Sequence, residues 1–409
     1  MAEPSKFNPK EKVHGDPLEI PALACGAMAG SKPYVAAPNH QAPLGFPGEL
    51  AENWQEKAIG RLGELLDSNR ALRVYLDSCV KCGACTDKCH YFLGTGDPKN
   101  MPVARQNLLR KVYRRYFTWG GKIVPWLVGA EDLTKEVLDD WYSYFHQCSQ
   151  CRRCSVYCPY GIDTAEISMA ARDIMDTIGL GQKYSNEIIG KVFNVGNNLG
   201  LPPKALKATL AGLEDEIEEE TGVPVRLPLD EKGADILLVT PSADFFASPH
   251  MEGLIGYAKV LHEAGVKWTF STHASEAANF GMFIGSHENM KKVATRIVTA
   301  AKELGVKRIV FGECGHAWRV AYSFLDTLAG PLDFLDPNYP KPQHICEFTY
   351  DLIQRGKLRF DKSKNDEIRL TFHDSCNVAR ASRMGDKPGG QFEIPRAILR
   401  ASCNHFFDM

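Results

Sequence analysis

Eight of the thirteen cysteines in this 409-residue chain repeat one spacing, and the repeat restricts the fold more than any other feature. Each copy reads C-x2-C-x2-C-x3-C, and proline follows the second copy. Three cysteines at intervals of three can hold three corners of one [4Fe–4S] cubane in a tight loop, and the fourth is free to bind the other cubane. The copies consist of Cys79, Cys82, Cys85 and Cys89, and of Cys148, Cys151, Cys154 and Cys158.

The fourth cysteine of each copy is expected to cross over. One cluster would then be held by Cys79, Cys82, Cys85 and Cys158, and the other by Cys148, Cys151, Cys154 and Cys89. Structural zinc is the alternative, but zinc takes its cysteines as two separated pairs and has no use for four in each run. His90 stands where Pro159 stands in the second copy, which is expected to change backbone stiffness and not ligation.

The bulk composition is that of an ordinary globular protein, with 44% hydrophobic residues and a formal net charge of −2. This charge gives no indication of nucleic-acid binding. There is no run of 18 apolar residues and no secretory signal, so the sequence predicts neither a membrane span nor export. Many cysteines without a signal peptide favour metal ligation in a reducing compartment over disulfides.

Helical patterns dominate the region of the cysteine runs. Residues 1–50 read as an irregular, proline-rich arm carrying a lone Cys25, which we interpret as incidental. Residues 51–181 follow, with helices expected near Trp54, over Pro102–Tyr116, over Leu133–Phe145 and from Asp163 to Met175. The long helical segment between the cysteine runs predicts an α-helical ferredoxin domain. Residues 182–232 read as a helical connector whose acidic run is a solvated face.

Residues 233–409 alternate between strand and helix, which predicts a parallel sheet with helical crossovers, so the fold class is α plus α/β. The expected strands are Ala234–Thr240, Val266–Ser271, Val306–Gly312 and Ile368–Phe372, and the expected helices are Met251–Ala264, Glu288–Leu304 and Ile345–Arg355. No glycine-rich nucleotide-binding pattern follows any of these strands.

Two of the expected strands lead into cysteines in similar contexts, Cys314 and Cys376. Ligands bind at the carboxyl ends of strands in open parallel sheets, so the pair hints at an internal duplication and a shared site. The alternative is two buried, inert thiols, because free cysteine is often a core residue.

The segment Phe372-His-Asp-Ser-Cys-Asn-Val-Ala-Arg380 is similar to the H-D-P-C-x-x-x-R run of D-type heterodisulfide reductase iron–sulfur proteins. The resemblance covers nearly the whole chain. With the following residues through Gln391, the segment is most similar to DsrK-like subunits of the membrane complex associated with dissimilatory sulfite reductase. It implies an α-helical ferredoxin domain followed by a cysteine-rich domain of the CCG type.

In that family the CCG domain holds a third, non-standard iron–sulfur centre that reduces a disulfide. The centre uses the H-D-x-C cysteine, a Cys-Cys-Gly pair and a later C-x-x-C pair. Only Cys376 of that set is present here, while Cys314 resembles the cysteine of a degenerate first half. No Cys-Cys dipeptide occurs, so we expect a C-terminally incomplete chain. Cys346 and Cys403 have no partner in this pattern and are interpreted as core thiols.

The resemblance implies an electron-transfer oxidoreductase subunit of dissimilatory sulfur metabolism. Electrons would pass between a membrane quinone or cytochrome b-type partner and a disulfide on a DsrC-like sulfur-carrier protein, through two [4Fe–4S] clusters and a third centre at Cys314 and Cys376. We expect the chain in the cytoplasm, peripheral on the inner membrane. The sequence does not reveal the reaction direction, the cluster potentials or the stoichiometry of the complex.

Two other functions compete with this hypothesis. The first is a pure electron relay for a flavin-dependent 2-hydroxy acid or glycerol-3-phosphate dehydrogenase, and an absent Cys-Cys-Gly in the full reading frame would favour it. The second is a scaffold, which has no need of two redox centres. Five basic residues near the cysteine runs either steer an acidic carrier or form a solvated face: Lys111, Arg114, Arg115, Arg152 and Arg153. His373 is a candidate proton donor or hydrogen-bond partner of Cys376.

Overall fold

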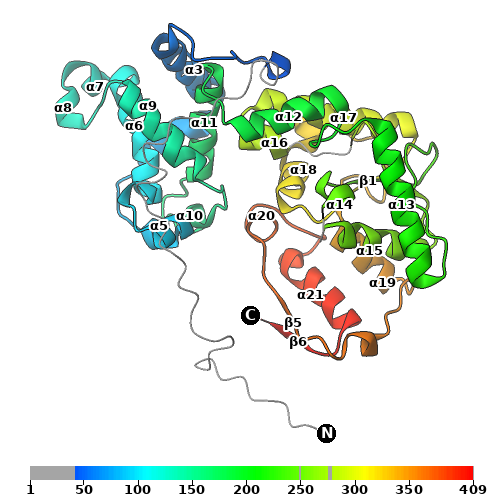
Figure 1. Cartoon of the computed structure of the whole chain (residues 1–409). Coiled ribbons are helices and arrows are strands. Elements are labelled where there is room, and N and C mark those ends of the chain that lie inside the picture. Colours follow the sequence, from blue (N-terminus) through cyan, green and yellow to red (C-terminus); the bar gives the residue numbers. More distant parts are fainter. Residues whose placement is uncertain (1–41, 248–249, 275–278, 409) are drawn as a thin grey trace.

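The computed structural model describes residues 42–247, 250–274 and 279–408. It shows a helix-rich chain with a small parallel sheet (Figure 1). Most of the arm expected at the N-terminus, including Cys25, lies outside these residues. Within the described part of the chain, no helix combines the length and the apolar character that a membrane crossing needs.

The region of the cysteine runs is entirely helical in its regular structure. The helices expected near Trp54, from Pro102, from Leu133 and from Asp163 are present to within a few residues, as α3 (Trp54–Ser68) with α4 (Arg70–Ser78), α6 (Pro102–Phe117), α9 (Lys135–His146) and α11 (Thr164–Thr177). Four short helices were not predicted: α5 (His90–Thr95), α7 (Trp119–Ile123), α8 (Pro125–Val128) and α10 (Arg153–Val156). Helix α6 begins at a proline. Proline suits the first helical position because a backbone N–H there would have no partner within the helix, so its absence costs nothing. Helix α11 begins after Asp163, whose carboxylate accepts from the Ala165 N–H.

Helix α11 lies at the centre of this region. Its side chains Ile167, Ala171 and Ile174 are fully buried, and it packs against α3, α6 and α9. Trp141 of α9 and Leu109 of α6 fill the same core. Full burial of such side chains stabilises by about 1.5–3 kcal/mol each, so this core holds the cysteine runs on a firm helical frame.

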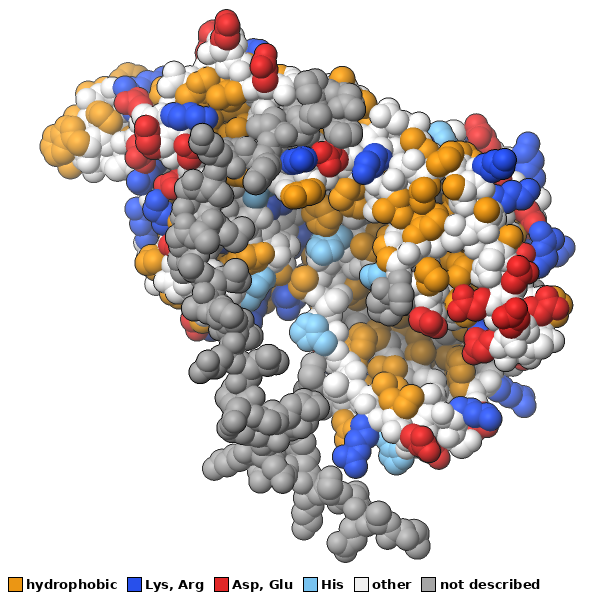
Figure 2. All heavy atoms as spheres, viewed as in Figure 1, with side chains coloured by type: hydrophobic (Ala, Val, Ile, Leu, Met, Phe, Trp, Pro, Cys, Tyr) orange, Lys and Arg blue, Asp and Glu red, His pale blue; other side chains and the backbone are white. Residues whose placement is uncertain are grey.

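Helices α7 and α8 protrude from the end of this region that lies away from the sheet (Figure 1). Their tip is apolar and exposed (Figure 2), with Trp119, Ile123, Trp126 and Leu127 open to solvent. Exposed apolar groups of this size commonly mark contact surfaces.

Helices α12 (Lys183–Val195) and α13 (Pro203–Thr221) connect this region to the sheet. The acidic run expected in the connector lies on the second half of α13, where Glu216, Glu218 and Glu219 are exposed. The buried face of α13 carries Leu206, Leu210, Leu213 and Ile217. The helix is therefore amphipathic, with its charges in solvent.

The main sheet has four parallel strands in the order β2-β1-β3-β4. These are β1 (Ile236–Val239), β2 (Trp268–Thr269), β3 (Arg308–Phe311) and β4 (Gln343–His344). The helices of this part are α14 (Ala243–Phe246), α15 (His250–Glu263), α16 (Asn279–Phe283), α17 (His287–Leu304), α18 (Gly315–Ala329) and α19 (Ile345–Gln354). The expected parallel sheet with helical crossovers is therefore present.

Both faces of the sheet are covered. Leu237 and Val239 of β1 share one core with α17 and α18, whereas Ile236 and Leu238 pack on the other side with α13, α15 and α19. This alternation is the two-residue period of a strand buried on both faces. It explains why β1 reads as a continuous apolar run in the sequence.

One expectation about the sheet is wrong. The strand predicted at Ile368–Phe372 forms as β5 (Leu370–Phe372) but does not join the main sheet. It pairs in parallel with β6 (Phe406–Asp408) in a separate two-stranded sheet, with α20 (Cys376–Ala379) and α21 (Gly390–Ser402) between them. The position at the edge of the main sheet is taken by β4, whose two polar residues give no strand signal.

Candidate metal centre

The two cysteine loops share one backbone conformation. In each loop the third and fifth residues, counted from the first cysteine, adopt positive φ: Lys81 (58°) and Gly83 (81°), then Gln150 (57°) and Arg152 (58°). Left-handed residues that alternate with right-handed ones turn successive N–H groups to one side, and such concave nests are typical of iron–sulfur sites. Three of these four residues are not glycine, so the surrounding structure must hold them in an unfavourable conformation.

The cysteines line two neighbouring cavities. The first is lined by Cys79, Cys82, Cys85 and Cys158. The second is lined by Cys89, Cys148 and Cys151, and Cys154 lines both. Each cavity thus receives the fourth cysteine of the opposite run, which is the grouping that the crossover predicts. Which sulfur binds which cluster stays a prediction.

The first turns of two helices form the other walls of the cavities. Val103 and Gln106 of α6 line the first cavity, and Arg105 of α6 lines the second. Thr164 and Ala165 at the start of α11 line the first and second cavity, respectively. Helix N-termini carry partial positive charge, so both cavities favour a negatively charged group such as a thiolate-ligated cluster.

The first cavity has one exposed thiol, Cys82, whereas Cys79 is buried and Cys85 and Cys158 are half-buried. The Gln106 side chain donates from Nε2 to Cys79 Sγ at 2.7 Å. Burial raises the pKa of Cys85 to about 11, against the lowering effect of the Val103 N–H, and the neighbouring Cys158 and Cys79 raise it further. The crowded thiol of Cys85 therefore stays protonated when no metal is bound. A bound metal would supply the positive charge that stabilises its thiolate form.

The second cavity lies among positive charges. Burial acts to raise the pKa of Cys148, but the guanidinium groups of Arg105 and Arg172 outweigh it and the net shift is downward. The pKa of Cys154 is raised to about 12, because burial and the negative charge of Cys148 act in the same direction. The Gln150 side chain lines this cavity, and both polar atoms of its buried amide lack a hydrogen-bond partner within the described residues.

These features fit two all-cysteine iron–sulfur clusters. The donor set is sulfur in both cavities, the two loops share the positive φ angles that are typical of N–H nests, and polar side-chain atoms of Gln106 and Gln150 at the walls have no hydrogen-bond partner among the described residues. When bound, such clusters supply one-electron redox chemistry. The residues described here would hold the clusters, shield them and set the charge around them.

Three arginines fix the second cysteine loop to the rest of the chain. Arg172 of α11 donates to the carbonyl oxygens of Phe145 at 2.7 Å, Cys148 at 2.5 Å and Phe283 at 3.1 Å. Arg319 of α18 donates to the Gln150 carbonyl at 3.0 Å, and Arg380 donates to the Cys151 carbonyl at 3.1 Å. The first loop has no comparable bond to the sheet region among the hydrogen bonds of the described residues.

Cys314 and Cys376 lie at the N-terminal ends of two contacting helices, α18 and α20. A Cβ atom on Gly315 would lie 3.1 Å from Ser375 Oγ and 3.2 Å from Val378 Cγ2, so the segments that carry the cysteines are packed together. Both are half-buried, and Asn377 Nδ2 donates to Cys376 Sγ at 3.3 Å. The two cysteines were expected at the edge of one sheet, and this is wrong, because β3 and β5 belong to different sheets. The packing of α18 against α20 brings their segments together instead.

Arg319 also connects this pair to the second cavity. Besides the Gln150 carbonyl, its Nη1 donates to Asn377 Oδ1 at 3.3 Å, next to Cys376. The sequence prediction missed Arg319, as it missed Arg172 and Gln106. For Arg319 the sequence did offer a signal, because it is a charged residue on the otherwise apolar face of an amphipathic helix, four residues after Gly315.

Most of the basic residues proposed to steer a carrier have local partners. Lys111 pairs with Glu131, Arg115 with Asp132 and Arg152 with Asp163, while Arg114 donates to the Val128 carbonyl. These contacts favour the solvated-face interpretation. His373 is exposed. Cys403 is buried and its Sγ donates to the Leu399 carbonyl, and burial raises the pKa of Cys346 to about 12, as suits core thiols.

Comparison with known proteins gives a consistent result. Residues 75–162 match the family model of the 4Fe-4S dicluster domain. The chain is 41% identical over 391 residues to the Hdr-like menaquinol oxidoreductase iron-sulfur subunit of Archaeoglobus profundus, covering 88% of this chain and 69% of the relative. It is likewise 41% identical to iron-sulfur subunit 2 of that name from Archaeoglobus fulgidus, with the same coverage.

A more distant relative comes from Methanosarcina mazei, where it is the D subunit of the dihydromethanophenazine:CoB–CoM heterodisulfide reductase. The two chains are 23% identical over 331 residues, which cover 79% of this chain and 72% of the relative. No solved structure matches the chain significantly. The resemblance to the heterodisulfide-reductase-type family, stated from the Cys376 segment, is confirmed.

Proposed function

Because this chain belongs to the family of Hdr-like menaquinol oxidoreductase iron–sulfur subunits, we propose that it carries electrons from a membrane partner to a disulfide. The electrons would enter at the first cysteine cavity, pass to the second and leave at Cys314 and Cys376. Membership of this family supports an iron–sulfur subunit of an oxidoreductase. The direction, the number of clusters and the acceptor are part of the proposal.

The observation that carries this proposal is the Arg319 bridge. One guanidinium group contacts both the Gln150 carbonyl in the second cysteine loop and Asn377 beside Cys376. Arg380, four residues after Cys376, contacts the same loop at the Cys151 carbonyl. The rate of electron transfer falls steeply with distance. Arg319 and Asn377 are the two residues in the hydrogen-bonded path from the Gln150 carbonyl to Cys376, and such a short path suits an exit for electrons.

The first cavity suits electron entry because its rim is open and apolar. Cys82 is exposed, as are Val80 and Tyr160, which line the same cavity. An apolar, solvent-exposed rim around a redox site is the kind of surface on which a protein donor docks. We propose a membrane subunit of cytochrome b type as the donor and a peripheral position for this chain on the cytoplasmic side.

At the exit site the chemistry must deliver two electrons. Reduction of a disulfide breaks one S–S bond and takes up two electrons and two protons to give two thiols. The electrons arrive singly, so the site must retain a half-reduced state between them. Cys314 and Cys376 would supply thiolates for a third iron–sulfur centre, and the acceptor would be a disulfide or trisulfide on a DsrC-like carrier of dissimilatory sulfur metabolism.

The test is a comparison of cysteine variants in the intact membrane complex, kept anaerobic. Cys376→Ser is expected to abolish quinol-dependent disulfide reduction while the protein retains about eight cluster irons and still reduces a one-electron dye. Cys403→Ser is the matched control, because this thiol is buried in the same part of the chain but lies outside the proposed path. Undiminished disulfide reduction by Cys376→Ser would overturn the proposal and favour a pure relay.

A further inference from the structure

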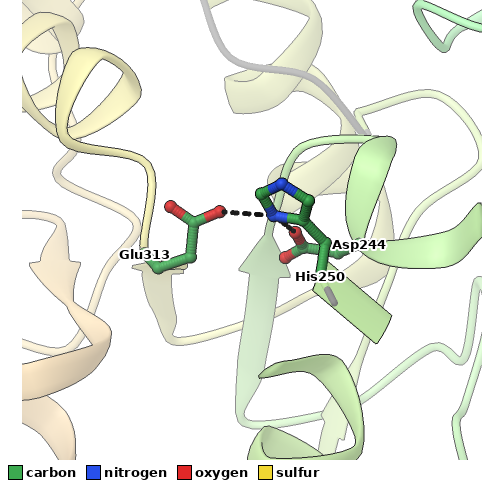
Figure 3. A group of neighbouring side chains, drawn as sticks. All are labelled: Asp244, His250 and Glu313. Atoms are coloured by element: carbon green, nitrogen blue, oxygen red, sulfur yellow. Dashed lines mark ion pairs between the residues drawn. The ribbon is translucent and has the colours of Figure 1, made fainter. Parts of the chain in front are cut away.

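A second group of potential metal ligands lies at the carboxyl edge of the main sheet, outside the cysteine sites. It consists of Asp244, His250 and Glu313, whose ligand atoms all lie within 4.8 Å of one another (Figure 3). Asp244 is on α14 after β1, Glu313 follows β3, and His250 begins α15. Because β1 and β3 are adjacent and parallel, their carboxyl ends bring the two carboxylates together.

Asp244 is the reason to look for a ligand here. Its side chain is 1% exposed, and Thr240 Oγ1 donates to only one of its oxygens, Oδ2. The other oxygen, Oδ1, is buried without a hydrogen-bond partner among the described residues and points toward His250 (Figure 3). A buried carboxylate oxygen without a partner is strongly unfavourable, so the fold has placed an acceptor where something positive is needed.

The spacing of the three groups is close to that of a metal site. His250 Nδ1 lies 3.8 Å from Asp244 Oδ1 and 3.8 Å from Glu313 Oε1. Ligand bonds of about 2.1 Å would separate neighbouring ligand atoms by roughly 3.0–3.4 Å, so contractions of less than about 1 Å would bring these two pairs into contact with one ion. His250 and Glu313 are exposed, which leaves them free to make this movement and leaves room for water ligands.

The backbone around the group is fixed. A Cβ atom on Gly312 would lie 2.9 Å from Thr240 Oγ1, so only glycine lets the end of β3 approach the end of β1 this closely. Tyr257 lies beside the same place, since a Cβ atom on Gly312 would be 3.6 Å from its Cε2 atom. Burial and then the charges of Asp244 and Glu313 raise the pKa of Tyr257. The two strand ends therefore present a preformed pair of oxygens, and the helix α15 adds a nitrogen.

We propose that Asp244, His250 and Glu313 bind one divalent transition-metal cation. One imidazole nitrogen with two carboxylates suits Zn²⁺ or Mn²⁺ and gives little affinity for Mg²⁺, which prefers oxygen and water ligands. The ion neutralises two carboxylates, one of them buried, that otherwise repel each other. Burial and the charge of Glu313 already raise the pKa of Asp244, to about 7, despite the Thr240 hydrogen bond.

The site has a consequence for its neighbour in the sequence. Glu313 directly precedes Cys314, so an ion held by Glu313 fixes the backbone that presents Cys314 at the start of α18. The cation would therefore be structural with respect to electron transfer. It supports the position of a sulfur without contacting the sulfur.

The proposal is tested with Mn²⁺, because this ion avoids thiolates and is detected directly by electron paramagnetic resonance. Anaerobic protein with oxidised, diamagnetic clusters is titrated with Mn²⁺, and the signal of free Mn²⁺ reports binding. The wild-type protein is expected to bind one Mn²⁺. His250→Gln and Glu313→Gln are each expected to weaken binding by at least about tenfold.

His262→Gln is the matched control, since His262 is an exposed residue near the other end of α15, about 18 Å along the helix. It is expected to bind Mn²⁺ as the wild type does. Iron content and thermal unfolding of each variant show whether it is folded, and His250 is an exposed side chain whose loss should leave both unchanged. Absence of stoichiometric Mn²⁺ binding in the wild type, or equal affinity in His250→Gln and wild type, would overturn the proposal.

Discussion

The two cysteine loops have the same spacing and the same alternation of left-handed residues, but their surroundings differ. The first loop is open, with Cys82 exposed and a neutral amide, Gln106, bonded to Cys79. The second loop has no exposed cysteine, and its carbonyl oxygens accept from Arg172, Arg319 and Arg380. One backbone conformation thus serves two sites that differ in the charge around them and in their contacts with the rest of the chain.

This difference separates what the loop does from what its environment does. The loop conformation orients sulfur and N–H groups, whereas the charge nearby favours or disfavours an additional electron. Guanidinium groups around the second loop favour added negative charge, so we expect the second site to accept electrons from the first. The following predictions test this comparison.

The largest effect is expected from the crossing cysteines. Cys89→Ser should remove the cluster of the second run and Cys158→Ser that of the first, each losing about four of about eight irons. Iron analysis with electron paramagnetic resonance of the reduced protein distinguishes the two. If Cys89→Ser instead disturbs the site formed by Cys79, Cys82 and Cys85, the crossover assignment is wrong.

Loss of Arg172 should damage the second loop selectively. This buried guanidinium group donates to three carbonyl oxygens, and Arg172→Gln leaves most of them without a partner. The expected loss of stability is about 2–5 kcal/mol, measured as earlier bleaching of the second cluster in anaerobic guanidinium chloride. Arg115→Gln is the control, since Arg115 forms a surface pair with Asp132 and should change stability by about 1 kcal/mol or less.

Arg380 provides a smaller test of the charge difference. Arg380→Gln removes an exposed positive charge that contacts the Cys151 carbonyl, so the midpoint potential of the second site should fall by a few tens of millivolts. A redox titration followed by electron paramagnetic resonance measures this shift. Lys81→Gln is the matched change in the first loop and should lower the first potential instead. An equal shift of both sites in both variants would contradict separate environments.

The smallest effect concerns the loop backbone itself. Gly83 has φ of +81°, and a Cβ there would meet only Thr86 Oγ1 at 3.8 Å, so Gly83→Ala should cost about 1 kcal/mol through conformation alone. Gly94 lies in α5 with open space around it, and Gly94→Ala should stabilise by about 0.5–1 kcal/mol. Denaturant midpoints of cluster loss should therefore move in opposite directions. A shared direction would show that the left-handed conformation is not required.

Much of the local structure could be predicted from the sequence because it depends on near neighbours. Helix α9 was expected from Leu133, and it begins at Lys135 after Thr134, whose side chain caps it. Strands β1 and β3 were expected because burial on both faces produces an unbroken apolar run. The pairing of β5 with β6 could not be predicted, because pairing depends on a segment more than 30 residues away.

The candidate sites show the same limit. Regular spacing indicated the eight cysteines, and the resemblance indicated Cys376. Arg319 gave no such signal, because its role depends on the Gln150 carbonyl, 169 residues earlier. Asp244 and Glu313 come together only because β1 and β3 are neighbours, and no local pattern connects them. Residues that act through long-range contacts therefore cannot be predicted from the spacing of residues in the sequence.

The arginine contacts of the second loop also bear on how sequences of this family can diverge. Arg172, Arg319 and Arg380 all donate to main-chain carbonyl oxygens, those of Cys148, Gln150 and Cys151. A carbonyl is present whatever side chain the residue carries, whereas only arginine offers this reach and number of donors. The side chains of the loop residues take no part in these bonds, so natural variation should be restricted at the three arginines, all of which lie outside the second cysteine run.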